Sequence, residues 1–193
     1  MRVKLLGGLS VLFFIAGSAY GQQLEVTELD GGSVTTKLIA DIALNKGSSL
    51  HRKWFLINSP SCPIRLDGAG VRTVYGDRNY SFEPAGNIAA TEAVTAFEVR
   101  FMLFDLWGEH MKTLSGTELH DLDAGTTFAL SEVGSWRARE TDVAQYLTAV
   151  GFIAHVRTGD GRTWRAETSA ILQEVEAVKL SLTLEELEPT TGD

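Results

Sequence analysis

The stretch that decides the fold is Phe97–Asp105, FEVRFMLFD. Its odd positions from 97 to 103 are apolar, while Glu98 and Arg100 lie between them. Alternation with a period of two predicts a β-strand that buries one face and exposes the other. Met102 and Phe104 extend the apolar character to the second face, so we expect the end of this strand to be covered on both sides.

Other strand-like stretches surround it. A second long strand is predicted over about residues 145–157, and the turn Thr158–Gly161 (TGDG) leads into a shorter strand at residues 162–166. Asp-Gly between two such runs is a strong hairpin signal, because glycine adopts the positive φ angles of a tight turn. Shorter strands are predicted at residues 24–28, 38–44, 52–57, 64–66, 71–75 and 80–83. Many short strands separated by turn residues predict a β-sandwich.

The pattern changes after the last strand. Over Thr168–Val178 apolar residues recur at spacings of three and four, which is typical of one face of a helix. Thr183–Glu186 (TLEE) has the form of a capping box, and Pro189 ends the short turn that it begins. We therefore expect a sandwich over residues 22–167, then a C-terminal helical appendage over residues 168–188 that packs across a sheet edge or an open end. Residues 189–193 are expected to form a disordered tail.

The first 21 residues have the layout of a secretory signal peptide. Arg2 and Lys4 precede the apolar run Leu9–Ala16, and the small residues Ala19 and Gly21 fit a cleavage site after Gly21. The apolar run is shorter than the roughly 20 residues that span a bilayer, so removal is favoured over anchoring. We expect a periplasmic or secreted location, with no membrane insertion after signal cleavage.

The mature chain is predicted to be acidic. Removing Arg2 and Lys4 from the 17 basic residues leaves 15 against 25 acidic ones, a net charge of 15 − 25 = −10. Such a charge repels phosphate backbones and anionic lipid surfaces, which argues against nucleic acid as a partner.

The single cysteine, Cys62, excludes an intrachain disulfide and is expected to be buried, although an intermolecular link or a reactive thiol are alternatives.

One short motif resembles a known family. Phe101–Asp105 (FMLFD) resembles the F-x-L-Y-D signature of bacterial extracellular Ig-like domains, with Phe104 in place of the tyrosine, and Gly108 follows it. Ile57–Ser59 is similar to the end of an earlier strand in that family. Two departures are the roughly 40 residues at 60–99 between these blocks and the C-terminal helix. The resemblance implies an Ig-like β-sandwich that serves as a binding or accessory module, without catalytic residues.

The densest polar stretch, residues 107–123, contains His110, His120 and several carboxylates, which are groups that zinc accepts as ligands. Each histidine lies next to an acidic residue, and adjacent side chains of an extended chain point to opposite faces. At most one member of each pair could therefore contact a shared ion. The alternative is a pair of solvated turns on either side of an edge strand.

The four tryptophans, Trp54, Trp107, Trp136 and Trp164, either pack in the core or offer stacking surfaces. Trp107 and Trp136 lie beside glycine-containing turns, so they are the candidates for ligand contact, together with His110 and His120.

We thus predict a mainly β protein, an Ig-like β-sandwich with a C-terminal α-helix. Its predicted role is an exported binding or accessory module of the cell envelope, with no catalysis, cofactor or metal of its own. The expected partner is another envelope or extracellular protein. One alternative is a metal-assisted or carboxylate hydrolase using His110, His120 and nearby acids. Another is a structural subunit whose copies are linked through Cys62 or a sheet edge.

Overall fold

The computed structural model describes residues 24–33, 51–76 and 79–190. The predicted signal peptide at residues 1–21, the predicted strand at 38–44 and the end of the predicted tail at 191–193 lie outside the described residues.

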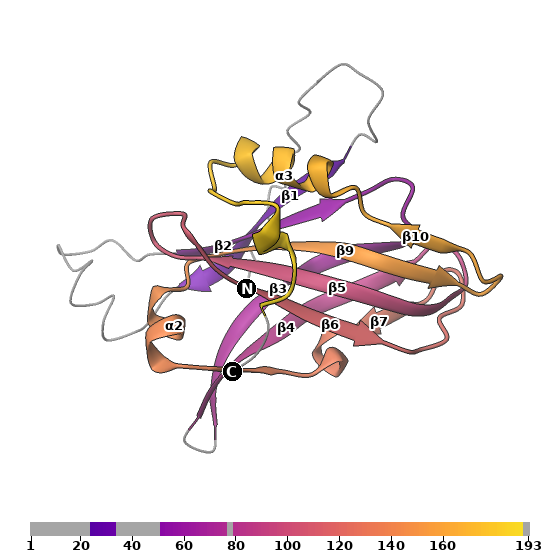
Figure 1. Cartoon of the computed structure of the whole chain (residues 1–193). Helices are drawn as coiled ribbons and strands as arrows, with labels where there is room; N and C mark the ends of the chain where they lie inside the picture. Colours follow the sequence, from indigo (N-terminus) through magenta and orange to yellow (C-terminus); the bar gives the residue numbers. More distant parts are fainter. Residues whose placement is uncertain (1–23, 34–50, 77–78, 191–193) are drawn as a thin grey trace, which may run out of the picture.

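Within these residues, ten strands form two β-sheets that face each other (Figure 1). The larger sheet has the order β1-β2-β9-β5-β6, with β10 paired to β9, and the smaller one has the order β3-β4-β7, with β8 paired to β4. The strands of the larger sheet are β1 (Glu25–Ser33), β2 (His51–Asn58), β5 (Val94–Phe104), β6 (His110–Glu118), β9 (Thr148–Thr158) and β10 (Thr163–Arg165). Those of the smaller sheet are β3 (Ile64–Gly76), β4 (Asn79–Ala90), β7 (Thr127–Ala129) and β8 (Trp136–Ala138).

Four short helical segments complete the described chain: η1 (Leu130–Val133), α2 (Glu140–Gln145), α3 (Thr168–Ala177) and η2 (Glu185–Leu187). The prediction of a mainly β sandwich with a C-terminal α-helix is confirmed. Most neighbouring strands are antiparallel, but β2 and β9 are parallel, with Phe55 opposite Val150. No helix within the described ranges is both long enough and apolar enough to cross a bilayer.

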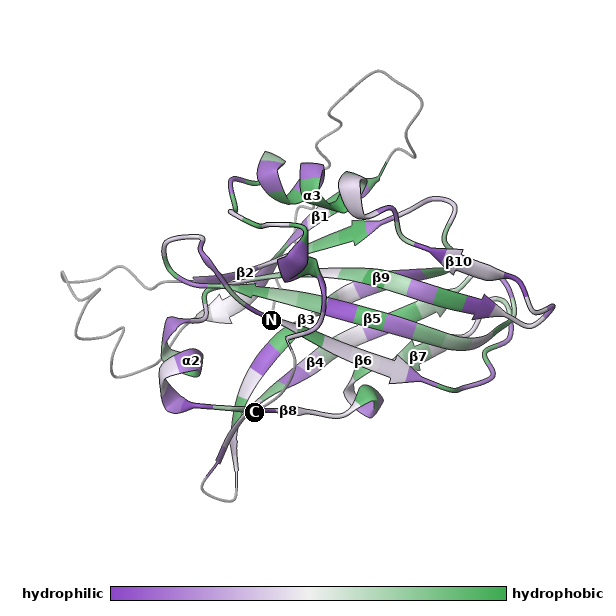
Figure 2. Cartoon of the chain, in the orientation of Figure 1, coloured by the Kyte–Doolittle hydropathy of each residue, from purple (hydrophilic) through white to green (hydrophobic). Residues whose placement is uncertain are grey.

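The main core lies between the two sheets. The odd positions of β5 from 97 to 103 are fully buried there, as the alternation of FEVRFML predicts, and Figure 2 shows this alternation along the strand. Tyr146 lies at one end of this core with no exposed surface. Its hydroxyl donates to the carbonyl of Val71 (2.9 Å) and accepts from the indole N–H of Trp54 (3.1 Å). This phenol therefore connects the two sheets through hydrogen bonds.

The indole of Trp54 lies against the backbone of β3 at Gly70. A Cβ atom at Gly70 would be 1.9 Å from Cδ2 of Trp54, much closer than van der Waals contact. Gly70 also ends an irregularity in the pairing of β3 with β4, which begins at Asp67. Because this irregularity shifts the alternation, the sequence suggests two strands at 64–66 and 71–75 where the structure has one.

A second core covers the outer face of the larger sheet. Met102 and Phe104 are completely buried beneath Ile171 and Val175 of α3 and Leu187 of η2. The predicted covering of this end of β5 on both faces is thus confirmed. The predicted placement of α3 at a sheet edge or open end is wrong, because the apolar outer face of β2, β5 and β9 gives the helix a larger surface to bury (Figure 1).

The predicted hairpin at Thr158–Gly161 is confirmed. Thr158 N–H donates to the carbonyl of Arg162 (2.9 Å), and Gly161 adopts a φ of +87°. The predicted capping box is formed in part, since the carboxylate of Glu186 accepts hydrogen bonds from the N–H (2.7 Å) and the hydroxyl (2.8 Å) of Thr183.

The end of the described chain is attached to β6, which is an edge strand of the larger sheet. Thr190 N–H donates to the carbonyl of Thr113 (2.9 Å), and the hydroxyl of Thr190 accepts from Thr113 N–H (2.9 Å). The expectation that residues 189–193 form a disordered tail is therefore wrong at Thr190, because the open edge of β6 offers the backbone groups that hold it.

Candidate functional site

Trp107, one of the predicted contact residues, is strongly exposed, with 81% of its surface accessible. It lies in the turn between β5 and β6. One carboxylate oxygen of Asp105 accepts hydrogen bonds from the N–H groups of Trp107 (2.8 Å) and Glu109 (3.0 Å). Gly108 has a φ of +80°, which glycine adopts without strain. The Asp and Gly of this turn thus fix the backbone on both sides of the indole.

The C-terminal segment holds the same turn from a second side. The carbonyl of Gly108 accepts a hydrogen bond from Ser181 N–H (3.1 Å), and Glu109 forms a parallel β-bridge with Ser181. The turn is therefore fastened both within itself and to the segment that follows α3. As a result, Trp107 combines an exposed side chain with a fixed backbone.

Trp136, the second predicted contact residue, is only partly exposed. Its ring packs against the main core, and its indole N–H donates to the carbonyl of Ser115 on β6 (3.1 Å). Trp164 is held in a similar way by a hydrogen bond to the hydroxyl of Ser61 (3.1 Å). A glycine-containing turn next to a tryptophan is thus a signal that does not distinguish the exposed Trp107 from the packed Trp136.

His110 is buried at the start of β6, with 8% of its side chain accessible. Its Nε2 is 2.9 Å from the hydroxyl of Thr113, and its Nδ1 is 3.4 Å from a carboxylate oxygen of Glu186. The ring also contacts Phe104 edge to face. These contacts make His110 part of the attachment between β6 and η2, and leave little of it free to bind a ligand.

His120 is exposed and lies beyond the other end of β6, where its ring contacts Phe128 with centroids 5.1 Å apart. His110 is the first of the nine residues of β6 and His120 follows its last residue by two positions, so roughly 25 Å of strand lies between the two rings. The structure therefore does not bring the two imidazoles together. In the part of the chain that the structure describes, no three potential metal-ligating side chains form a group.

Acidification from neutral pH to about pH 5 is expected to destabilise the protein through His110. Burial disfavours the charged imidazole and holds the pKa of His110 below 6.5, although Glu186 partly offsets this. Below pH 6.5 the unfolded chain then binds more protons than the folded one, so stability falls as the pH falls towards the folded-state pKa.

Denaturant unfolding at a series of pH values measures this slope. The variant His110→Gln should flatten it, whereas His120→Gln, at an exposed ring, should leave it unchanged. Equal slopes for the wild type and His110→Gln would contradict the prediction.

Cys62 is buried, as the sequence analysis expects, with 7% of its surface accessible. Burial raises the pKa of its thiol to about 12, far above neutral pH. Since the thiolate is the nucleophilic form, Cys62 is poorly suited to react or to link two copies of the folded chain.

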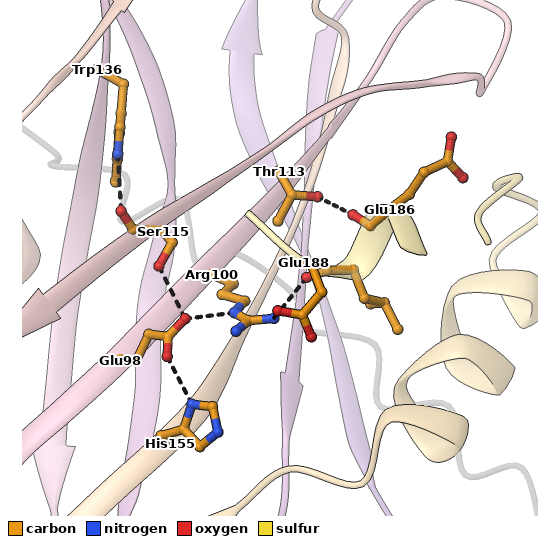
Figure 3. A network of polar contacts seen from close by, with 9 residues as sticks. Glu98, Arg100, Thr113, Ser115, Trp136, His155, Glu186 and Glu188 are labelled. Atoms are coloured by element: carbon orange, nitrogen blue, oxygen red, sulfur yellow. Dashed lines mark hydrogen bonds and ion pairs between the residues drawn. The ribbon is translucent and has the colours of Figure 1, made fainter. Parts of the chain in front are cut away.

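A polar network that the sequence analysis did not identify lies on the outer face of the larger sheet (Figure 3). Arg100 of β5 donates from Nε to Glu98 (2.6 Å) and from Nη1 to the carbonyl of Leu187 (2.9 Å). Nη1 is also 3.0 Å from a carboxylate oxygen of Glu188. The second oxygen of Glu98 accepts from Nδ1 of His155 on β9 (2.7 Å). The network thus joins β5 and β9 to the segment that contains Leu187 and Glu188.

Burial and hydrogen bonding oppose each other at Glu98. Burial alone would raise the pKa of its carboxyl group, but hydrogen bonds from Arg100, His155 and Ser115 outweigh it, so the pKa lies below its usual value. Arg100 itself is only 7% exposed. Glu98 is therefore an ionised carboxylate at neutral pH, paired with a guanidinium that water barely reaches.

A shallow cleft that opens to solvent adjoins this network. It lies between the outer face of β9 and β10, the start of α3, and η2. Polar groups line it from Arg100, His155, Arg165, Thr168 and Glu188. Arg165 is opposite His155 in the pairing of β10 with β9, and His155 is opposite Glu98 in the pairing of β9 with β5. The register of three strands therefore places these side chains in one row.

The alternation of Glu98 and Arg100 with apolar residues predicts a solvated face, and this expectation is wrong for Arg100. The reason is the C-terminal segment, which covers that face from residues more than 80 positions away in sequence. In the sequence, the signal that this face of β5 is covered is the apolar pair Met102 and Phe104, which lies on the same face as Arg100.

Comparisons with known proteins identify no relative: the chain matches no family model, no curated protein and no solved structure.

Proposed function

We propose that the chain is an exported Ig-like binding or accessory module of the cell envelope, which contacts another envelope or extracellular protein through Trp107. The observation that carries the proposal is the combination of 81% exposure of Trp107 with its fixed turn. Tryptophan is enriched among the residues that dominate binding energy at protein interfaces. A preordered backbone also reduces the entropy that binding costs.

The negative charge of the chain and of the residues near Trp107 indicates what kind of partner surface would fit this turn. The whole chain has a formal net charge of −8, and the exposed Glu109 lies two residues after Trp107. Electrostatic complementarity then favours a partner with an apolar pocket for the indole and basic groups around it. The resemblance of Phe101–Asp105 to bacterial extracellular Ig-like domains supports the same role, since the Trp107 turn directly follows that motif.

Replacing Trp107 with alanine is expected to weaken partner binding by about 2 kcal/mol, or about 30-fold in Kd, as for a central interface tryptophan. Folding should not change, because the indole makes few contacts in the free protein. The matched control is Leu119→Ala, at a residue that is 84% exposed and lies at the other end of β6.

A photo-crosslinking residue placed at position 107 or 119 in cells identifies the partner. A purified pair then gives the Kd values for wild type, Trp107→Ala and Leu119→Ala. The proposal fails if crosslinking at position 107 gives no discrete product, or if both alanine variants bind equally well.

A further inference from the structure

We infer that the cleft beside Arg100 binds a carboxylate group of a ligand, and that Glu188 of the chain itself occupies this position when no ligand is bound. The site uses none of the residues of the Trp107 turn and does not depend on the function proposed for it. Its argument rests on three features of the described residues: a buried guanidinium, a second arginine at the cleft, and an exposed carboxylate that contacts the first.

The buried guanidinium of Arg100 has hydrogen-bond donors that no described residue uses. Its Nε and Nη1 groups contact Glu98, the carbonyl of Leu187 and Glu188, whereas Nη2 makes no hydrogen bond to any residue that the structure describes. Arginine presents its donors in a planar fork that suits a carboxylate. Because Arg100 is 91% buried at its side chain, an anion that reaches it is little screened by solvent.

Glu188 shows that this guanidinium accepts a carboxylate from the solvent side. Its Oε2 lies 3.0 Å from Nη1 of Arg100, although 59% of its side chain remains accessible. It follows η2 and is not itself packed into the outer core. Glu98, by contrast, is mostly buried and is also held by His155 and Ser115. Of the two carboxylates on Arg100, Glu188 is therefore the one that a ligand can replace at low cost.

Arg165 and Thr168 supply the remaining groups for a ligand. Both line the cleft, and neither side chain forms an ion pair or hydrogen bond with a described residue. Arg165 lies in the same cross-strand row as His155 and Glu98, and Arg100 is two residues after Glu98 on β5. If a ligand carboxylate displaces Glu188, two guanidinium groups and one hydroxyl surround it, with Glu98 balancing one charge. The cleft then carries a net positive charge on an otherwise acidic protein.

The experiment is a titration of the full mature chain, followed by NMR at the side chains of Arg100 and His155. Sodium acetate and a pentaalanine peptide with a free carboxyl terminus are the two probes, which distinguish a small carboxylate from a peptide terminus. Sodium chloride at equal ionic strength and the amidated peptide are the controls.

We expect saturable shifts with acetate, with the peptide, or with both, and none with the controls. Glu188→Gln should lower the Kd about three- to tenfold, because it removes the internal competitor and raises the fraction of chains whose site is open. Its matched control, Glu185→Gln, removes the same charge from the same segment and should have no such effect. Arg165→Gln should raise the Kd at least threefold, while Arg157→Gln, at an exposed arginine of β9 outside the cleft, should not.

The inference is overturned if neither probe gives saturable shifts, or if chloride reproduces them. It is also overturned if Glu188→Gln and Glu185→Gln bind the probes equally. Thermal unfolding of each variant confirms that it is folded, so that a loss of binding is not mistaken for a loss of structure. A variant that changes probe binding but leaves crosslinking at position 107 unchanged separates this site from the function proposed above. A variant that changes crosslinking but not probe binding does the same.

Discussion

Gly70→Ala is expected to lower the free energy of unfolding by about 3 kcal/mol or more, which is at the upper end for overpacking a core. The added Cβ would lie 1.9 Å from Cδ2 of Trp54 and 2.1 Å from Cε3, so the indole must move. It cannot move freely, because its N–H is hydrogen-bonded to the hydroxyl of the buried Tyr146. The strain therefore spreads into the contact between the two sheets.

Denaturant unfolding of Gly70→Ala beside Gly76→Ala measures the effect. Gly76 is on the same strand, but a Cβ atom there meets nothing within 4 Å, so the control should change stability by less than about 0.5 kcal/mol. Trp54→Leu in the Gly70→Ala background should recover part of the loss, because the smaller side chain leaves room for the methyl group. Similar stabilities for the two alanine variants would show that the Trp54 ring does not constrain β3.

Arg100→Met is expected to destabilise the protein by about 3 kcal/mol, the cost typical of removing one partner from a buried ion pair. The variant keeps an unbranched apolar stem about as far as Nε but leaves the carboxylate of Glu98 with only His155 and Ser115 as donors. It also leaves the carbonyl of Leu187 without the donor that holds η2 against the sheet.

A double variant tests this explanation. Glu98→Gln in the Arg100→Met background removes the uncompensated charge, so it should recover about 1 kcal/mol or more of the loss. The control Arg157→Met changes an exposed arginine on β9 and should have an effect below about 0.5 kcal/mol. If Arg100→Met is as stable as this control, the ion pair does not hold the C-terminal segment in place.

The parts of the fold that the sequence predicts are those set by local periodicity. β5, the hairpin after Thr158 and the apolar face of α3 follow from residues that are close together in the chain. β7 and β8 could not be predicted in this way, since three residues are too few to show a period. The face of the sheet on which α3 packs was also beyond prediction, because Met102 and Ile171 are far apart in sequence.

The candidate site shows the same division. Trp107 was one of two tryptophans that the sequence offered for ligand contact on the basis of a neighbouring turn, and in its turn Asp105 and Gly108 act locally. The packing of Trp136 and the burial of the His110 and Arg100 side chains depend on partners such as Ser115, Glu186 and Leu187, which are 21 or more positions away. The sequence therefore identified single residues with a plausible chemistry, but it did not show which residues lie together in the folded chain.

The attachment of the last described residues to β6 has a consequence for the surface of the larger sheet. An edge strand normally offers a row of unpaired N–H and C=O groups on which a strand of another molecule can add. Here Thr190 takes both outward groups of Thr113, and the indole of Trp136 takes the carbonyl of Ser115. This part of the edge is closed to strand addition, so Thr190 and a tryptophan from the opposite sheet protect it from edge-to-edge aggregation.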